Sequence, residues 1–375
     1  MKRLLTIGHS YVVGLNRRLA HEMALQGRER WTVTAAAPAE YPGDLRTITL
    51  EPIANEACRV VPLRTRLARS PHVMTYRGLR PLLHEGWDVV HCWEEPYVAA
   101  AAQIAQGAPL DAAFVFSTFQ NIAKTYPFPF GRMEKSVLAR ANGWIAFGVS
   151  IHEVQTGRGG RYASLPARVI TPGVDTDAFA PDQSVRASAR SQLGWTDDVP
   201  VVGFLGRLVE EKGVRTLLDA LPVGSVPWRV LFVGDGPERQ AIDAFARRHE
   251  GRVRIISHAT HDDVPRWLNA MDVLCAPSRT TPAWREQFGR MLVEAMACGV
   301  PVVASDSGEI PHVVGDAGVI VPESATADWA ATLETLLTDP VARADYAQRG
   351  RRRALDRYAW PIIARQHLDF FETLT

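Results

Sequence analysis

The chain alternates short apolar runs with amphipathic stretches from near its first residue to near its last. Segments such as VVGFL and RVLFV are continuously apolar, which is typical of parallel strands covered on both faces. Stretches between them, for example 238–250 and 262–271, repeat apolar residues at helical spacing. Strands are predicted at Leu4–Ile7, Thr32–Ala36, Asp88–Cys92, Ala113–Ser117 and Trp144–Phe147, and again at Val201–Leu205, Arg229–Val233, Val253–Ile256, Asp272–Ala276, Pro301–Ala304 and Val319–Val321. Repeated βαβ units of this kind predict an α/β protein with two Rossmann-like, doubly wound parallel sheets.

A polar segment at residues 167–181 divides this pattern into two parts. A last short strand runs there into Pro-Gly and then into a stretch rich in Asp, Ser and Ala. The predicted domains are residues 1–170 and 171–356, and residues 357–375 are predicted to form a helix that crosses back to the first domain. A length of 375 residues also favours two domains over one.

The cysteines and the N-terminus bear on the compartment. Cys58, Cys92, Cys275 and Cys298 lie far apart, which argues against a disulfide framework or a structural zinc site and favours a reducing compartment. The opening run MKRLLTIGHS turns polar after five residues, so a strand is predicted and not a signal peptide. No stretch approaches the ~20 apolar residues that span a bilayer. We therefore expect a cytoplasmic protein whose contact with a membrane, if it makes one, is peripheral.

The two halves of the chain differ in charge. Residues 1–170 hold 20 Lys and Arg against 13 Asp and Glu, whereas residues 171–375 hold 22 against 28. The basic half includes the run 59–80, with six arginines and no carboxylate. Such a run indicates either a surface that meets an anionic partner or the solvated face of a helix.

The strongest local signal is EQFGRMLVEAMACGVPVVAS at residues 286–305. Phe288 and Gly289 are predicted to open a helix there, and a helix N-terminus offers free N–H groups and a positive dipole to a diphosphate. Gly289 would let the backbone amides of Arg290 and Met291 approach phosphate oxygens, and Phe288 is placed with them in the donor pocket.

Two glutamates in the same segment are separated by seven residues. Glu294 would lie inside the helix, where its carboxylate could accept hydrogen bonds from ribose hydroxyls. Glu286 precedes the helix and would point toward whatever lies beyond the phosphates. Eight residues at helical rise span ~12 Å, which is roughly the distance from ribose to sugar in a sugar nucleotide.

A second cluster, GRLVEEKG, follows the predicted strand VVGFL. Arg207 and Lys212 would stand at the carboxyl end of a parallel strand, where open α/β sheets bind ligands, and could neutralise a diphosphate. The loop 255–263 is predicted to line the base, with His258 nearest to it. Asp175 and Asp177 spell D-x-D but fall in the interdomain segment, so no metal site is predicted.

These segments, together with PGVDTDAF, VGDGPE and MDVLCAPS, follow one another in an order that resembles a known family. The chain is similar to the retaining GT-B glycosyltransferases with the Glu-(seven residues)-Glu motif, of the group 1 type. The resemblance implies that Arg207 and Lys212 bind the diphosphate, Glu286 the donor sugar and Glu294 the ribose. It also implies retention of anomeric configuration, a nucleotide diphosphate sugar as donor substrate, and no metal or other cofactor.

The first half departs from the family pattern. Instead of a Gly-rich loop after the first strand, the chain reads IGHSYVVGLNRRLA, so Gly14 is predicted as the loop glycine and His9 as an acceptor contact. The family histidine after the strand AAFVFS is replaced by the sequence STFQNIAK. Gln120 or Asn121 is predicted to supply a neutral hydrogen bond in its place.

The predicted function is transfer of a hexose-type sugar to the hydroxyl of an acceptor that is anionic or lipid-linked, without involvement of nucleic acid. A catalytically degenerate GT-B protein that only binds sugar nucleotides and a GT-B nucleotide-sugar epimerase stay open as alternatives. A dinucleotide-dependent oxidoreductase is disfavoured because neither first βα turn carries G-x-G-x-x-G.

Overall fold

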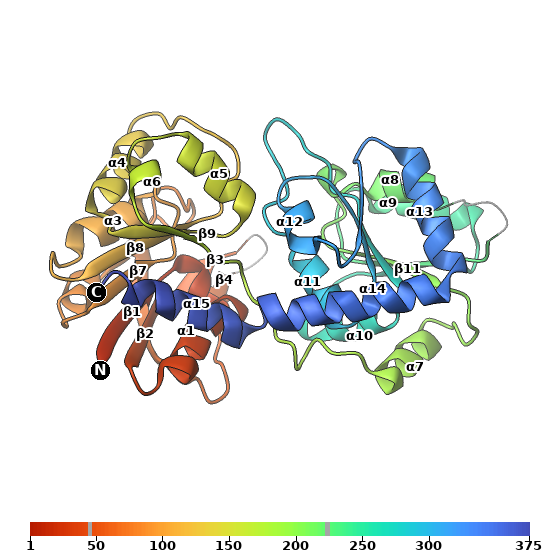
Figure 1. Cartoon of the computed structure of the whole chain (residues 1–375), viewed down its shortest axis with the longest axis horizontal. Helices are drawn as coiled ribbons and strands as arrows, with labels where there is room; N and C mark the ends of the chain where they lie inside the picture. The colour runs from red at the N-terminus through yellow and green to blue at the C-terminus, as the bar shows by residue number, and fades with distance from the viewer. Residues whose placement is uncertain (44–46, 222–225) are drawn as a thin grey trace. The chain divides into compact units, whose positions relative to one another are not determined.

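The computed structural model describes residues 1–43, 47–221 and 226–375. The chain divides into two compact units, Met1–Gly173 with Trp360–Thr375 and Val174–Ala359 (Figure 1). Each unit is built around its own mainly parallel sheet, so the predicted α/β fold class is confirmed. Every strand predicted from the sequence is present, each within two residues of its predicted bounds.

The sheet of the first unit has eight strands in the order β10-β9-β8-β7-β1-β2-β5-β6. All neighbours are parallel except β5 and β6. The strands are β1 (Lys2–Ile7), β2 (Trp31–Pro38), β5 (Arg59–Arg66), β6 (Thr75–Arg77), β7 (Val89–Cys92), β8 (Ala113–Thr118), β9 (Gly143–Ala146) and β10 (Ala167–Val169). A separate antiparallel pair is formed by β3 (Glu40–Pro42) and β4 (Thr47–Thr49).

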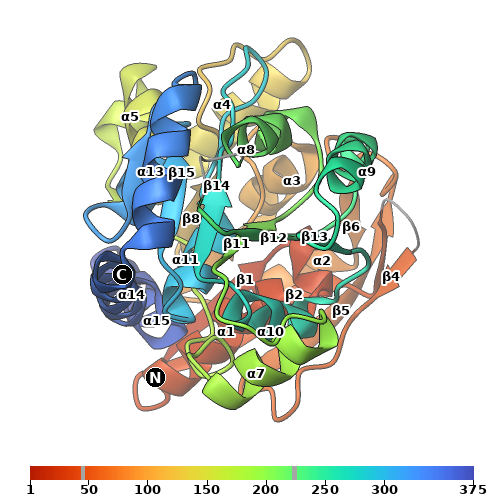
Figure 2. The ribbon, with the colours of Figure 1, turned by 90° about the vertical axis from the view of Figure 1, so that its right-hand side faces the viewer.

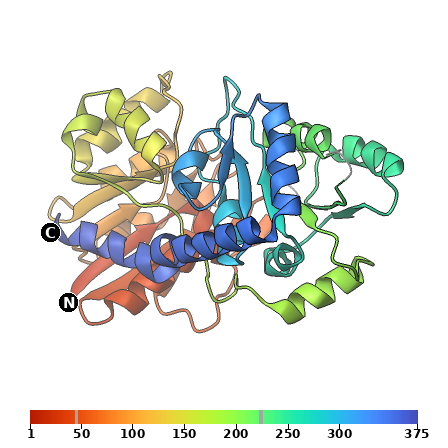
Figure 3. The same cartoon turned by 45° about the vertical axis from the view of Figure 1, so that its right-hand side comes forward.

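Helices cover both faces of this sheet because its strands are apolar on both sides. Leu4 faces a core formed with α1 (Gly14–Gly27) and α15 (Trp360–Glu372), and α15 packs beside α1 (Figure 3). Leu5 and Ile7 face the opposite core. That core is closed by α2 (Leu79–Leu83), α3 (Ala99–Gly107), α4 (Phe130–Arg140), α5 (Val149–Gly157) and α6 (Arg161–Ser164).

The basic run 59–80 forms mainly strands, so its interpretation as the solvated face of a helix is wrong. Residues Arg59–Arg66 form β5, which pairs in parallel with β2, and Thr75–Arg77 return antiparallel as β6. Val60, Val61 and Thr65 are β-branched and favour a strand. Only the end of the run, from Leu79, is helical.

The sheet of the second unit has six parallel strands in the order β13-β12-β11-β14-β15-β16 (Figure 2). They are β11 (Val201–Leu205), β12 (Arg229–Val233), β13 (Val253–Ile256), β14 (Val273–Ala276), β15 (Val302–Ser305) and β16 (Val319–Val321). One face packs on α8 (Val214–Ala220), α9 (Arg239–Arg248) and α13 (Thr326–Thr338). The other face packs on α10 (Val264–Asn269), α11 (Arg290–Ala297), α12 (Ile310–Val314) and the π-helix Ala354–Tyr358. Behind these, α14 (Pro340–Arg353) packs on α11 and α7 (Gln183–Gln192) on α10.

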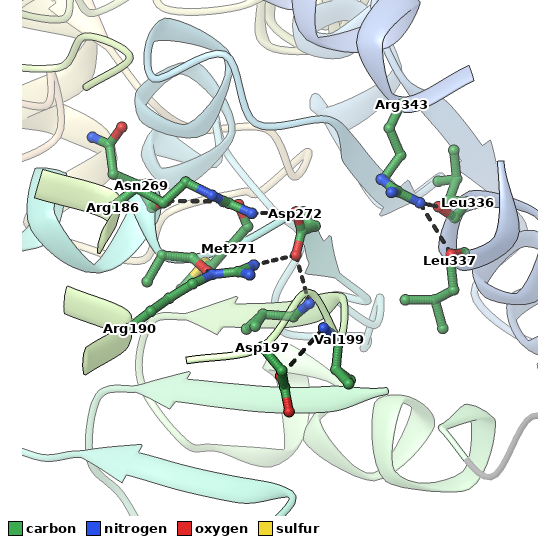
Figure 4. A network of polar contacts seen from close by, with 12 residues as sticks. Arg186, Arg190, Asp197, Val199, Asn269, Met271, Asp272, Leu336, Leu337 and Arg343 are labelled. Atoms are coloured by element: carbon green, nitrogen blue, oxygen red, sulfur yellow. Dashed lines mark hydrogen bonds and ion pairs between the residues drawn. The ribbon is translucent and has the colours of Figure 1, made fainter. Parts of the chain in front are cut away.

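A polar network ties α7 to the amino-terminal edge of this sheet (Figure 4). The guanidinium groups of Arg186 and Arg190 both pair with the carboxylate of Asp272, just before β14. The same carboxylate accepts the backbone N–H of Val201, the first residue of β11, at 2.7 Å. This network lies at the opposite edge of the sheet from the carboxyl ends of the strands, where the predicted site residues are found.

None of the helices in the described ranges combines the length and the apolar character that crossing a bilayer requires.

Candidate functional site

The predicted donor-side residues follow strands β11 and β14 of the second unit. Strand order reverses between these two neighbours, because the chain adds β12 and β13 on one side of β11 and β14 on the other. Open α/β sheets bind ligands outside the carboxyl ends of strands at such a reversal. The loop after β11 carries Arg207 and Lys212, and the loop after β14 carries Glu286.

Lys212 and Glu286 meet at this edge. The Nζ of Lys212 lies 2.6 Å from Oε2 of Glu286, and the Ser278 hydroxyl donates to the same oxygen at 3.1 Å. The Lys212 ammonium also lies 5.0 Å from the ring centroid of Trp284. Both charged side chains are largely buried, so the pair is held in one place. An ammonium has three N–H donors, so Lys212 can bind Glu286 and an anion together.

Two glycines allow the loops to approach so closely. Gly213 has φ of +71°, and a Cβ there would lie 1.7 Å from the carbonyl oxygen of Pro277. Gly308 has φ of +57°, and a Cβ there would lie 2.1 Å from the carbonyl oxygen of Glu286. The backbone N–H of Glu309 donates to that same carbonyl at 3.0 Å. Gly213 and Gly308 therefore fix the backbone on either side of the Lys212–Glu286 pair.

The start of α11 lies directly after the loop that carries Glu286. Gly289 is the N-cap residue with φ of +72°, and Arg290 and Met291 form the first turn. The N–H groups of a first helical turn lack partners within the helix and can bind anions. Phe288 lies differently, since it is 5% exposed and packs in the core with its ring 6.0 Å from that of Tyr358.

Glu294 lies inside α11 with 5% of its surface exposed. Burial raises the pKa of its carboxyl to about 7, and the Arg290 guanidinium opposes this shift only in part. The Nδ1 of His261 lies 3.9 Å from Oε1 of Glu294. Burial also lowers the pKa of His261 below its ordinary value, which favours a neutral ring.

The other predicted donor residues lie further out. Arg207 is exposed, with its guanidinium 3.6 Å from the carboxylate of Glu211. His258 is also exposed, and its backbone has φ of +61°. The structure thus brings His261, and not His258, against Glu294. Asp175 of the D-x-D sequence accepts backbone N–H groups of Asp177 and Ala178 at 3.1 Å each, as in a local turn.

In the first unit, His9 and Gly14 follow β1. His9 starts the 3-10 helix His9–Val12, and its Nδ1 lies 2.5 Å from Oε2 of Glu94, which follows β7. Gly14 begins α1, and its N–H donates to Glu51 at 2.8 Å. The structure therefore joins the two predicted residues to two different carboxylates.

Gln120 and Asn121 follow β8. The side-chain oxygen of Gln120 accepts the N–H of Ile122 at 3.2 Å, and Asn121 is 3% exposed. Nearby, Glu95 accepts the Thr118 hydroxyl and the Phe119 N–H, each at 2.7 Å. Burial raises the pKa of Glu95 to about 7, although these hydrogen bonds lower it.

Comparison with known proteins identifies the family. Residues 199–339 match the family described as glycosyl transferases group 1. A phosphatidyl-myo-inositol mannosyltransferase of Mycobacterium leprae is 30% identical over 380 residues, covering 95% of this chain and 91% of that protein. A D-inositol 3-phosphate glycosyltransferase of Salinispora arenicola is 31% identical, covering 85% of this chain and 73% of that protein. The chain belongs to the group 1 family of glycosyltransferases.

Solved structures agree on the fold of this glycosyltransferase. HepE of Anabaena, crystallised with UDP, superposes with a TM-score of 0.77 at 21% identity, over 100% of both chains. The GT-B fold expected from the sequence is thereby confirmed. Membership of the family makes the protein an enzyme, a glycosyltransferase.

Several residues at the glycosyltransferase's candidate site were missed by the sequence analysis. Ser278 and Trp284 contact the Lys212–Glu286 pair, and Gly308 supports the Glu286 backbone. The turn sequence SDSGE, which begins at the last residue of β15, was a local signal for Gly308. His261 lies in the predicted loop 255–263, but its position beside Glu294 had no local signal, and neither had Glu94, because both depend on a partner distant in sequence.

Proposed function

We propose that this glycosyltransferase moves a hexose from a nucleotide diphosphate sugar to an acceptor hydroxyl, with retention and without a metal ion. The second unit is the donor side and the first unit the acceptor side. The observation that carries the proposal is the Lys212–Glu286 pair, held at 2.6 Å where strand order reverses, with the start of α11 next along the chain.

The diphosphate is assigned to the cations and to the helix start. In glycosyl transfer, negative charge grows on the leaving diphosphate, and fixed positive groups stabilise that charge most in the transition state. Lys212 supplies an ammonium held in place by Glu286, Arg207 supplies an exposed guanidinium, and Arg290 and Met291 supply backbone N–H groups. These groups take the role that a metal ion would otherwise have.

The ribose and the donor sugar are assigned to the two glutamates. Glu294 is buried behind the first turn of α11, and its carboxylate would accept hydrogen bonds from ribose hydroxyls. Because its pKa is raised to about 7, binding of hydroxyl donors would favour release of its proton near neutral pH. Glu286, oriented by Lys212 and Ser278, would contact the sugar itself.

The acceptor is proposed to be a phosphorylated polyol or its lipid-linked form. The two relatives described above, at 31% and 30% identity, are named for D-inositol 3-phosphate and phosphatidyl-myo-inositol. The six arginines of the run 59–80 are exposed on the first unit, which suits an anionic acceptor or a peripheral contact with an anionic membrane on the cytoplasmic side.

The test of this function is turnover followed by the configuration of the product. Donors GDP-mannose and UDP-glucose would be offered with inositol 3-phosphate or phosphatidylinositol, in excess chelator, and the product anomer read by NMR. We expect an α-linked product from an α-linked donor, with turnover unaffected by chelator. Lys212→Ala should lower kcat more than donor affinity, because its charge matters most in the transition state.

Other results would point elsewhere. A β-linked product would contradict retention, and activity lost with chelator but restored by magnesium would contradict the assignment of the cations. Nucleotide binding without transfer would favour a degenerate binding protein. Conversion of the donor to its epimer without acceptor would favour an epimerase.

A further inference from the structure

Trp284, in the second unit, is a large aromatic residue that does not serve core packing. All ten tryptophans of the chain lie in the described ranges, and eight of them are buried. Of the two that are partly exposed, Trp93 packs against both cores of the first unit. Trp284 belongs to neither core that the described residues form in the second unit. Another role must therefore explain why so large an apolar ring is kept there.

The ring of Trp284 lies against the ammonium of Lys212. The Nζ of Lys212 lies over the ring, 5.0 Å from its centroid, while Oε2 of Glu286 lies 2.6 Å from the same nitrogen. The face of an aromatic ring attracts a cation, and the attraction grows where water is excluded. The Lys212 side chain is largely buried, so ring and carboxylate together restrict a long side chain that is otherwise flexible.

The loop between β14 and α11 holds Trp284 in this place. At its start, the backbone N–H of Arg279 donates at 2.8 Å to the carbonyl of Glu211, the residue before Lys212. A turn then closes on itself, because Thr281 N–H donates to the Trp284 carbonyl at 2.8 Å and Trp284 N–H to the Thr281 hydroxyl at 3.0 Å. The position of the ring beside Lys212 is thus fixed by backbone contacts on both sides of the turn.

An aromatic ring can hold Lys212 without competing with a diphosphate. The charges of Lys212 and Glu286 offset each other, and a second carboxylate would hold the ammonium equally well but would repel phosphate. The ring carries no net charge, so it favours the cation and leaves its attraction for an anion intact. An ammonium has three N–H donors, which allows a further contact beside the one to Glu286.

We propose that Trp284 is a positioning residue that holds the Lys212 ammonium toward the phosphate next to the donor sugar. This inference rests on the proposed function and concerns the second unit alone. A nucleoside diphosphate has this second phosphate and a nucleoside monophosphate lacks it. The free diphosphate also carries the full charge of the leaving group, so its binding reports directly on the hold over Lys212.

The first experiment is calorimetric titration of the full-length protein with UDP, GDP and ADP and with the matching monophosphates. Trp284→Leu should weaken the preferred diphosphate by roughly 2- to 30-fold, the range of a cation–π contact, and leave the monophosphate unchanged. Trp284→Phe keeps a ring and should restore most of the difference. Equal weakening of diphosphate and monophosphate, or no weakening of either, would overturn the proposal.

Tyr346 on α14 offers a matched control. Its ring lies 4.4 Å from the guanidinium carbon of Arg349, and it is partly exposed like Trp284. Tyr346→Leu therefore removes a cation–π contact of the same unit away from Lys212 and should bind both nucleotides as wild type does. Thermal unfolding of each variant checks that the fold is kept. If Trp284→Leu does not fold, comparison of Trp284→Phe with wild type decides, and equal diphosphate binding by these two together with unchanged binding in Lys212→Ala would overturn the proposal.

The second experiment is a double-mutant cycle on kcat/KM, with GDP-mannose and UDP-glucose as donors and inositol 3-phosphate or phosphatidylinositol vesicles as acceptor. Trp284→Leu should lower kcat/KM in the wild-type background and have little further effect in Lys212→Ala, because it acts through Lys212. The same fold-loss in both backgrounds would overturn the proposal. A wild type that binds nucleotide but transfers no sugar contradicts the proposed function instead, and the comparison of diphosphate with monophosphate still decides the role of Trp284.

Discussion

Glu294 is an ionisable side chain in a place where ionisation is unfavourable, since it is 5% exposed and its pKa is raised to about 7 by burial. In the unfolded chain it should titrate near 4.5. Between these two pH values the folded state keeps a proton that the unfolded state has lost, so folding stability falls as pH rises through this window. A residue kept at such a cost is more easily explained by ligand binding than by packing.

Glu294→Gln cannot ionise and should therefore change the pH dependence of stability. Relative to wild type, the variant should gain roughly 2 kcal/mol of unfolding free energy at pH 8 and little at pH 5. Denaturant unfolding at the two pH values measures this, with the exposed Glu250→Gln as the matched control. Parallel pH dependence in Glu294→Gln and wild type would show that burial of Glu294 has no energetic consequence.

The site residues that lie within one short segment of the sequence could be predicted from that segment alone. Glu286, Gly289 and Glu294 stand in one continuous segment, so their spacing before and within α11 could be deduced from the sequence. Contacts between distant segments could not be. That His261 lies beside Glu294, or that Glu94 holds His9, depends on which strand ends become neighbours in the sheet.

At the scale of elements, the β5–β6 pair is an edge with unusual charge. Arg64 and Arg77 are direct cross-strand partners, and like charges opposite each other destabilise a sheet. Charged edges do protect against aggregation, yet carboxylates or lysines would serve equally. Within the described ranges, Arg64, Arg66 and Arg77 form no ion pair with a carboxylate. An anionic ligand would relieve this repulsion.

The edge is tested by replacing Arg64, Arg66 and Arg69 with Ser. Sedimentation with phosphatidylinositol-containing vesicles should capture wild type at low salt and release it at high salt, while the triple variant stays in solution. Arg247, Arg248 and Arg252 in the second unit, changed to Ser, remove the same charge as a control and should leave binding intact. Turnover on soluble inositol 3-phosphate separates a lipid surface from a free phosphate. Equal vesicle binding by the two triple variants would show that Arg64, Arg66 and Arg69 do no more than solvate the surface.

Elements hidden from sequence analysis were those with little apolar character. The buried parallel strands can be recognised in the sequence as apolar runs such as VVGFL. In contrast, β3, β4 and β6 have only three residues each, which is too short for such a run to stand out. β5 carries four polar or proline side chains exposed among its apolar ones, so its strand pattern is obscured by arginines.

At the scale of the whole molecule, alternation of strands and helices was sufficient to predict two doubly wound sheets. Each sheet places a reversal of strand order at one edge, and each reversal carries a carboxylate bound to a basic side chain, Glu286 with Lys212 and Glu94 with His9. Donor chemistry is proposed for the first pair and acceptor chemistry for the second. The two sites should therefore respond to mutation independently.

The most direct measurement is calorimetric titration of the full-length protein with UDP, GDP and ADP. Wild type should bind one of them, Glu294→Gln should bind it at least about 10-fold more weakly, a difference of about 1.4 kcal/mol, and His9→Gln should bind it as wild type does. Nucleotide binding that is absent from wild type, or unchanged by Glu294→Gln, would contradict a donor site at α11.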